Sequence, residues 1–137
     1  MRIYLIAAVL ALLALSVTAC SHGNQIKLNS ASAVPAASGS AKVGTDNNGN
    51  TTLAIQVNNL APPGNLTPPA TAYVVWIQPA GEPAQNAGIM KVEGDKLKGT
   101  FSTTTPFKNF ELLITAEGDP RASTPSGMVV MRQQVSR

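Results

Sequence analysis

The sequence predicts an all-β fold: an antiparallel β-sandwich of about eight short strands, immunoglobulin-like, after an N-terminal hydrophobic signal helix. Short runs of alternating apolar and polar residues recur between residues 25 and 135. Turn signals rich in Asn, Gly and Pro separate these runs, and no helical period appears beyond the leader. The prolyl loops are typical of crossings between two sheets, which favours a sandwich over a barrel.

Length and composition limit which classes of protein this chain can belong to. The 137 residues suit one domain, and 44% hydrophobic residues are ordinary for a globular protein. The net charge of +3 is spread without a basic run, and no Gly-rich phosphate loop appears, so we expect neither a nucleic-acid nor a nucleotide partner. A single cysteine, Cys20, excludes an intramolecular disulfide framework and a Cys-based zinc site.

The N-terminus predicts a secretory leader. Arg2 supplies a positive end, Ile3–Leu15 is almost continuously apolar, and the small residues of Ser16–Ala19 precede Cys20. This pattern resembles the bacterial lipobox, which implies lipidation of Cys20 and cleavage between Ala19 and Cys20. A plain signal peptide with a chance cysteine and an uncleaved transmembrane helix are the alternatives, although residues 1–19 are at the short end for a span.

Three segments follow from this reading: a signal peptide over residues 1–19, a lipidated tether over 20–24 and a β-sandwich domain over 25–137. Acyl chains, palmitate among them, are expected to hold Cys20 on a membrane. We therefore expect a lipid-anchored envelope protein that faces the periplasm or the cell surface. Ser21 follows the cysteine where an aspartate commonly marks inner-membrane retention, which favours the outer membrane.

The densest apolar run outside the leader, Thr71–Pro79, predicts the central strand. It contains the only Trp, Trp76, and one of the two Tyr, Tyr73. Alternation places Tyr73 and Trp76 on opposite faces, so both faces need cover and a paired ligand-stacking platform is disfavoured against burial in the core.

The strands before this run follow from alternation and turn signals. Residues 25–29, 40–45 and 51–59 predict strands, residues 30–39 a loop, and Asp46–Asn50 a tight hairpin turn. Four prolines in Ala61–Ala70 exclude strand and helix there and predict a crossover loop.

The C-terminal half predicts four more strands. Residues 87–92 and 96–103 form a hairpin around Glu93-Gly94-Asp95, with Val92 opposite Leu97, and residues 104–106 break the ladder. Residues 109–117 and 127–135 are the last strands, separated by a Pro/Gly/Ser loop over 118–126.

Candidate catalytic residues are sparse. The only histidine, His22, lies in the tether with no partner to orient it. Glu111 and Glu117 share a strand face but lie about 20 Å apart at about 3.4 Å per residue, too far to act as a carboxylate pair. We expect no enzyme and no cofactor; only a deep pocket converging on Glu82 or Glu117 would favour catalysis.

The turn at Asp46 has a second reading. Asp46, Asn48 and Asn50 have the one-three-five spacing of a calcium loop, but the glycine at six and the glutamate at twelve are missing. A hairpin turn is favoured over a weak cation site, and we expect no metal. Two N-glycosylation patterns, at Asn50 and Asn65, are interpreted as chance matches.

Residues 73–130 resemble the C-terminal extracytoplasmic domain of anti-sigma-K factors. The motifs that carry the resemblance are Val75–Gly81, Ile114–Pro120 and Thr124–Gly127, over less than half of the chain. The resemblance implies a shared extracytoplasmic β module. The chain shows neither the sigma-binding region nor the central membrane helix of those factors, so we do not expect it to sequester a sigma factor by itself.

Three functional hypotheses result. The first is a non-catalytic β-sandwich that binds an envelope protein or glycan through two loops, with Pro62, Pro63, Asn65, Arg121 and Thr124 as recognition residues. The second is a structural envelope lipoprotein without a specific ligand. The third is a sensory ectodomain related to anti-sigma factor regulation.

Overall fold

The structure, a computed structural model, describes residues 23–32, 34–93 and 95–137. In this part the chain is all-β apart from one short 3-10 turn. The elements are β1 (Asn24–Ser30), β2 (Ser38–Thr45), β3 (Thr51–Asn58), η1 (Pro63–Asn65), β4 (Ala72–Pro79), β5 (Gln85–Ile89), β6 (Lys91–Glu93), β7 (Lys98–Thr105), β8 (Asn109–Glu117) and β9 (Met128–Ser136).

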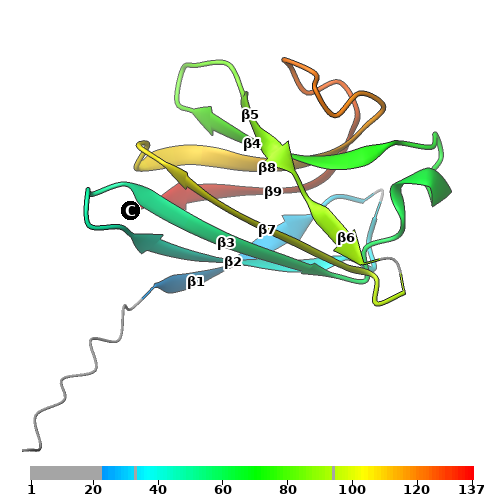
Figure 1. Ribbon diagram of the computed structural model, residues 1–137, viewed down its shortest axis with the longest axis horizontal. Coiled ribbons are helices and arrows are strands. Elements are labelled where there is room, and N and C mark those ends of the chain that lie inside the picture. Colours follow the sequence, from blue (N-terminus) through cyan, green and yellow to red (C-terminus); the bar gives the residue numbers. More distant parts are fainter. Residues whose placement is uncertain (1–22, 33, 94) are drawn as a thin grey trace, which may run out of the picture.

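The nine strands form one antiparallel sheet in the order β5-β4-β8-β9-β1-β2-β3-β7-β6 (Figure 1). The prediction of an all-β antiparallel fold is therefore confirmed. Because the two strands that end this order, β5 and β6, are consecutive in the chain, the sheet nearly closes on itself. About eight strands were expected, and the ninth arises because the predicted strand over 87–92 is divided at Met90.

Two segments change partners along their length. The first five residues of β1 pair with β2, whereas Asn29 and Ser30 pair with β9. On either side of Met90, β5 pairs with β4 and β6 pairs with β7. Met90 is buried at this change of direction, and its N–H donates to the carbonyl of Tyr73 over 2.9 Å.

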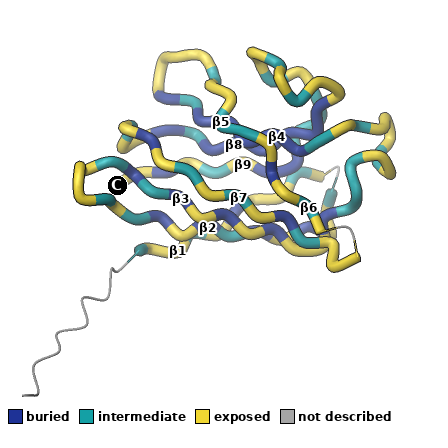
Figure 2. The backbone as a smooth tube through the Cα atoms, in the orientation of Figure 1, coloured by how far each residue is buried: buried dark blue, intermediate teal, exposed yellow. Residues whose placement is uncertain are grey.

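The main core follows from the alternation of the strands. In β3, Leu53, Ile55 and Val57 are buried while the residues between them are half-buried or exposed. Figure 2 shows the same alternation of buried and exposed segments along β2 and β3. A cluster of buried side chains from all parts of the sheet fills the interior; its largest fully buried members are Tyr73, Phe110, Leu53, Leu60, Leu112, Ile114 and Met131.

Strand β4 is buried on both faces, as its composition predicts. Tyr73, Val75 and Ile77 belong to the main core, whereas Val74 and Trp76 belong to a second cluster on the other side of the sheet. The prediction that Tyr73 and Trp76 face opposite ways is confirmed. The expectation of a central position is wrong, because β4 lies next to the terminal strand β5, and a folded loop rather than a second sheet covers its outer face.

The β6–β7 hairpin differs from its predicted register. Val92 pairs with Gly99, not with Leu97, which lies in the turn with a φ of 50°. A Cβ atom at Gly99 would lie 2.5 Å from the sulfur of Met90, so this position has no room for a side chain. The ladder of β7 with β3 also continues to Thr105, so the predicted break at residues 104–106 begins too early.

The loop before β4 is tied to the core rather than extended. It contains η1, which the prolines were expected to exclude, and Pro62 precedes the turn with a φ of −54° that proline readily adopts. The hydroxyl of Tyr73 donates to the carbonyl of Ala61 over 2.6 Å, and burial of this phenol raises its pKa. The loop over residues 61–70 thus closes one end of the main core.

Candidate functional site

The outward surface formed by β1, β2, β3, β7 and β6 is polar, and none of the segments that the structure describes covers it. We call this surface the polar face, and its side chains are Gln25, Lys27, Asn29, Ser38, Ser40, Lys42, Thr52, Ala54, Gln56, Asn58, Lys91, Glu93, Lys98, Thr100, Ser102 and Thr104. None of these residues is aromatic or a large aliphatic residue. All but three are exposed, and the three, Ser40, Thr52 and Lys98, are half-buried.

Strand register orders the polar face into rows. One row runs through Lys42, Ala54 and Ser102, which are successive cross-strand partners on β2, β3 and β7. Because Ala54 has the smallest side chain of the face, it leaves a hollow between the longer Lys42 and the strand β7. Hydroxyl and amide groups around this hollow offer both donors and acceptors.

One open cleft lies on this face, and a larger one, lined also by the core residues Val43, Leu53 and Val135, opens at its edge. The larger, of about 930 Å³, reaches from the end of β9 across β2, β3 and β7. The smaller, of about 370 Å³, lies wholly over the middle of the polar face. Both clefts are lined in part by Lys42, Ala54 and Ser102, and among the described residues no carboxylate side chain lines either one.

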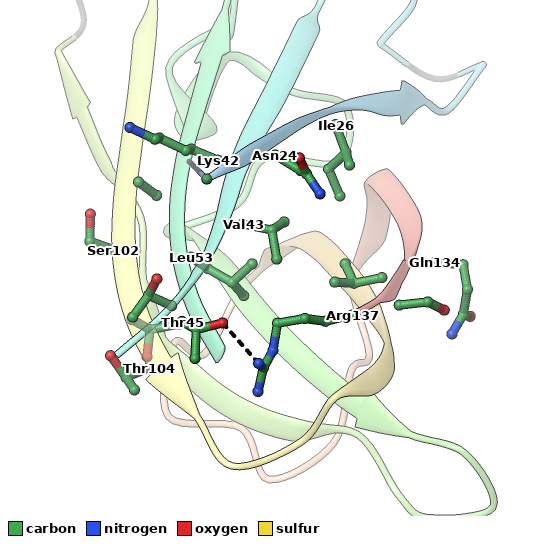
Figure 3. Close-up of a pocket in the computed structure, with 17 residues that line it drawn as sticks. Asn24, Ile26, Lys42, Val43, Thr45, Leu53, Ser102, Thr104, Gln134 and Arg137 are labelled. Carbon is green, nitrogen blue, oxygen red and sulfur yellow. Dashed lines mark hydrogen bonds between the residues drawn. The ribbon is translucent and has the colours of Figure 1, made fainter. Parts of the chain in front are cut away.

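The far end of the larger cleft is built by Arg137. Its guanidinium donates to the hydroxyls of Thr51 (2.9 Å) and Thr45 (2.8 Å) and to the carbonyl of Gly49 (2.6 Å). Figure 3 shows Arg137 reaching Thr45 below Val43, while Lys42 points to the other side of the strands. Arg137 therefore fixes the β2–β3 turn to the end of β9.

The β2–β3 turn is a hairpin, and the carboxylate of Asp46 accepts hydrogen bonds within it. Oδ1 of Asp46 accepts the N–H groups of Asn48 (2.8 Å) and Asn50 (2.9 Å), and Oδ2 accepts the side-chain amide of Asn50 (3.0 Å). The side-chain hydrogen bond from Asn50 is the main reason why the pKa of Asp46 is lowered. Gly49 has a φ of 81°, which the left-handed position of this turn requires. Both oxygens serve the turn, in agreement with the hairpin interpretation.

The opposite outward surface, over β4 and β8, is covered. Trp76, Val74 and Leu113 pack there with Ala84 and with Ala122 of the 118–126 loop. Asn86 on β5 donates its side-chain amide to the carbonyls of Pro120 (3.1 Å) and Ala122 (3.0 Å), which holds the loop down.

A buried hydrogen-bond chain fastens this cover. The indole N–H of Trp76 donates to the hydroxyl of Thr115 (2.8 Å), and that hydroxyl donates to Oε1 of Glu117 (2.5 Å). Ser126 donates its N–H to Oε1 (3.1 Å) and its hydroxyl to Oε2 (2.9 Å). Glu117 is 0% exposed, and its position two residues after Thr115 places both on the outward side of β8.

Burial alone would raise the pKa of Glu117. The hydrogen bonds from Thr115, from the backbone N–H of Gly127 and from Ser126 outweigh it, so the pKa is lowered and the carboxylate is the favoured form. No buried side-chain N or O among the described residues lacks a hydrogen-bond partner. Glu117 thus acts as a latch between β8 and the 118–126 loop.

The proposed recognition residues lie on two loops that leave the same end of the sheet, where the N–H of Thr71 donates to the carbonyl of Glu117 (2.8 Å). Asn65 on the first loop and Arg121 and Thr124 on the second are exposed; Pro62 and Pro63 are half-buried. In Figure 1 the second loop rises over the β4–β5 side, whereas the first stays at the end of the core.

The other sequence-predicted residues do not converge. Glu111 is half-buried and lies 3.6 Å from Nε of Arg132, and Glu82 is exposed in a turn. Neither of them, nor Glu117, lines a cleft. In the ranges that the structure describes, no group of three or more His, Cys, Asp and Glu side chains is placed to hold a metal ion.

The predicted leader, its cleavage site at Ala19, lipidation at Cys20 and His22 lie outside the described residues. The domain's first strand begins at Asn24, inside the segment predicted as tether. Over residues 23–32, 34–93 and 95–137, no helix has the length and apolar character needed to cross a membrane.

Sequence reasoning missed the polar face as a surface. Its signal was present in the outward positions of three neighbouring strands, which carry Ser, Thr, Gln and Lys but no large apolar residue. Which strands are neighbours cannot be read from the alternation itself. Comparison of the chain with protein-family models, with curated proteins and with solved structures finds no match.

Proposed function

We propose that this protein is a lipid-anchored lipoprotein of the bacterial cell envelope whose β domain is a non-catalytic binding module, with the polar face as its binding surface. One observation carries this proposal. Of the two outward surfaces of the sheet, the one over β4 and β8 is covered by the 118–126 loop, whereas no described segment covers the polar face, which carries one open cleft and borders a larger one. Concave, hydrogen-bonding surfaces on a rigid scaffold are typical of binding sites.

The anchor rests on the lipobox-like leader that ends at Cys20. Asn24, where β1 begins, is only four positions after Cys20 in the chain. Such a tether reaches at most about 14 Å. It would hold the domain close to the lipid surface, with the outer membrane favoured, facing the periplasm or the cell surface.

The finer description of the fold belongs to the same proposal. We regard the nearly closed sheet as a sandwich, with β1 and the β5–β6 segment passing from one layer to the other. The support is that each of these segments changes its pairing partner midway. An immunoglobulin-like arrangement and a relation to the anti-sigma-K ectodomain are extensions of this view that rest on the sequence alone.

Site-specific photocrosslinking tests the binding surface. A photoreactive amino acid at Ala54, in the hollow of the polar face, is expected to give a discrete adduct in intact cells. The same group at Arg121 or Thr124 is the matched control, because both residues are exposed on the covered side. Adducts from the loop positions alone would move recognition to the loops. A structural lipoprotein without a specific ligand would give no discrete adduct from any position.

Metabolic labelling tests the anchor separately. Wild-type protein is expected to incorporate radiolabelled palmitate and to fractionate with membranes, and Cys20→Ala is expected to lose both properties. Ser21→Asp is the matched control, because it leaves the thiol of Cys20 in place. This variant should keep the label and change only the membrane of residence. Equal labelling of Cys20→Ala and wild type would refute the anchor.

A further inference from the structure

The polar face has a one-sided charge. Four of its side chains are the lysines Lys27, Lys42, Lys91 and Lys98, and one, Glu93, is acidic, which gives the face a formal charge of +3. Glu93 lies at the border on β6, 3.4 Å from Lys96. Among the described residues, none of the four lysines is in a salt bridge. Lys98 is half-buried and is the cross-strand partner of Glu93, so the charges open to an anionic partner are those of Lys27, Lys42 and Lys91.

Two of the lysines, Lys27 and Lys91, end a row of cross-strand partners that crosses five strands. Lys27 on β1 pairs with Ser40, Ser40 with Gln56, Gln56 with Thr100, and Thr100 with Lys91 on β6. With about 4.8 Å between neighbouring strands, four steps place the two lysines about 19 Å apart. The three residues between them carry hydroxyl or amide groups. An elongated ligand with negative charges and many hydroxyls matches this row.

The composition of the face discriminates between classes of anionic partner. Single-stranded nucleic acids are bound by aromatic platforms on which bases stack, and the polar face has no aromatic side chain because Phe101 belongs with the core. Membrane surfaces are bound by basic faces that also insert large apolar residues, and protein hot spots are rich in Trp, Tyr and Arg. The polar face presents none of these.

We infer that the polar face binds a linear anionic polysaccharide, whose carboxylates lie over Lys27, Lys42 and Lys91 and whose hydroxyls bond Ser40, Gln56 and Thr100. This inference rests on the proposed function and names its ligand class. The hollow over Ala54 gives a sugar ring room to approach the sheet, and Lys42 borders that hollow. Lysine suits this role because its ammonium is a flexible point charge with three donors.

Binding of a defined oligogalacturonate to the full-length protein in a nonionic detergent, measured by calorimetry, tests the inference. The double variant Lys27→Gln/Lys91→Gln should weaken binding roughly fivefold to tenfold, because exposed ion pairs each contribute modestly. The control Lys108→Gln/Arg121→Gln removes the same charge at exposed positions away from the face and should stay within about twofold. Emission of the buried Trp76 confirms that all variants are folded.

Three outcomes would overturn the inference: equal weakening by the control variant, equal binding of neutral dextran, or tighter face-dependent binding of anionic phospholipid vesicles than of the oligosaccharide. A galacturonate disaccharide, too short to bridge the two ends of the row, should bind much more weakly than the oligomer. This test is distinct from the crosslinking experiment. A crosslink from Ala54 to a protein, without oligogalacturonate binding, overturns the ligand class and leaves the binding surface standing.

Discussion

Replacement of Glu117 by alanine removes the latch that holds the 118–126 loop over Trp76. The wild-type carboxylate accepts hydrogen bonds from Thr115 (2.5 Å) and from the N–H and hydroxyl of Ser126 (3.1 and 2.9 Å). Hydrogen bonds to a charged group contribute about 1.5–3 kcal/mol each, and their losses are not additive because the loop can reopen to water. We therefore expect Glu117→Ala to lower the free energy of unfolding by about 3 kcal/mol.

Urea denaturation followed by Trp76 fluorescence measures this loss. Trp76 is the only tryptophan, and it donates to Thr115 in the hydrogen-bond chain that leads to Glu117. In the folded variant, emission should also shift to longer wavelength as the loop lifts. Glu117→Gln keeps the shape but replaces one acceptor oxygen by a donor facing N–H groups, so it should cost about 1–2 kcal/mol.

Glu111→Ala is the matched control. Glu111 lies on the same strand and the same face, but its side chain is 33% exposed and forms a salt bridge with Arg132, at 3.6 Å. Surface ion pairs of this kind contribute about 0–1 kcal/mol. If Glu117→Ala and Glu111→Ala lower the unfolding free energy equally, or if neither changes Trp76 emission, the latch is not what secures the covered surface.

Further predictions concern pH, packing and the end of the larger cleft. The lowered pKa of Glu117 means that its stabilisation is present above its ordinary value of 4.5 and is lost as pH falls through the lower folded value; wild type should therefore lose stability with acidification below pH 4.5 more steeply than Glu117→Gln, as measured by urea titrations at each pH. Gly127→Ala would place a Cβ 1.8 Å from the carbonyl oxygen of Ala116, whereas Gly118→Ala at the other end of the loop meets nothing within 4 Å. We expect a loss of about 3 kcal/mol for Gly127→Ala and less than about 0.5 kcal/mol for Gly118→Ala in thermal unfolding, and equal losses would refute the close approach. Arg137→Ala removes three hydrogen bonds to the β2–β3 turn and should cost about 1–2 kcal/mol; Arg137→Lys should recover part of this, and an unchanged unfolding midpoint for Arg137→Ala would contradict the role of this residue.

The sequence predicts best those strands that keep the same neighbouring strands along their whole length. Residues 109–117 form β8 with the predicted bounds, and β3 and β4 each differ by one residue at one end. In these strands the apolar period of two coincides with burial, as it does for Leu53, Ile55 and Val57. Local alternation therefore determines both their conformation and their inward face.

The features that sequence does not predict depend on long-range geometry. Met90 interrupts nothing in the apolar pattern of 87–92, yet it is where the chain leaves one partner strand for another. Leu97 is an apolar residue that was expected in a strand, but it lies in a turn and has a positive φ. Both depend on packing between segments distant in sequence, which alternation within one segment cannot encode.

The candidate site was only partly predictable for a similar reason. Alternation identifies the outward residues of β2, β3 and β7 individually, but their assembly into one surface requires the order of the strands. Loop composition led the expectation toward residues such as Arg121, whereas the 118–126 loop also serves to cover Trp76. The buried role of Glu117 had a signal, since Thr115 and Glu117 share one side of a strand that pairs with the strand of Trp76.

The central claim is that a ligand in the envelope covers the polar face. Single cysteines at Ala54 and, as a control, at Thr124 make it measurable, because Cys20 is the only native cysteine and its thiol is consumed if it is lipidated. The rate of maleimide labelling is compared between isolated envelopes and detergent-solubilised protein. We expect Ala54→Cys to be protected in envelopes and reactive after solubilisation, while Thr124→Cys reacts equally in both. Equal labelling of Ala54→Cys in both states, or protection of Thr124→Cys alone, would contradict it.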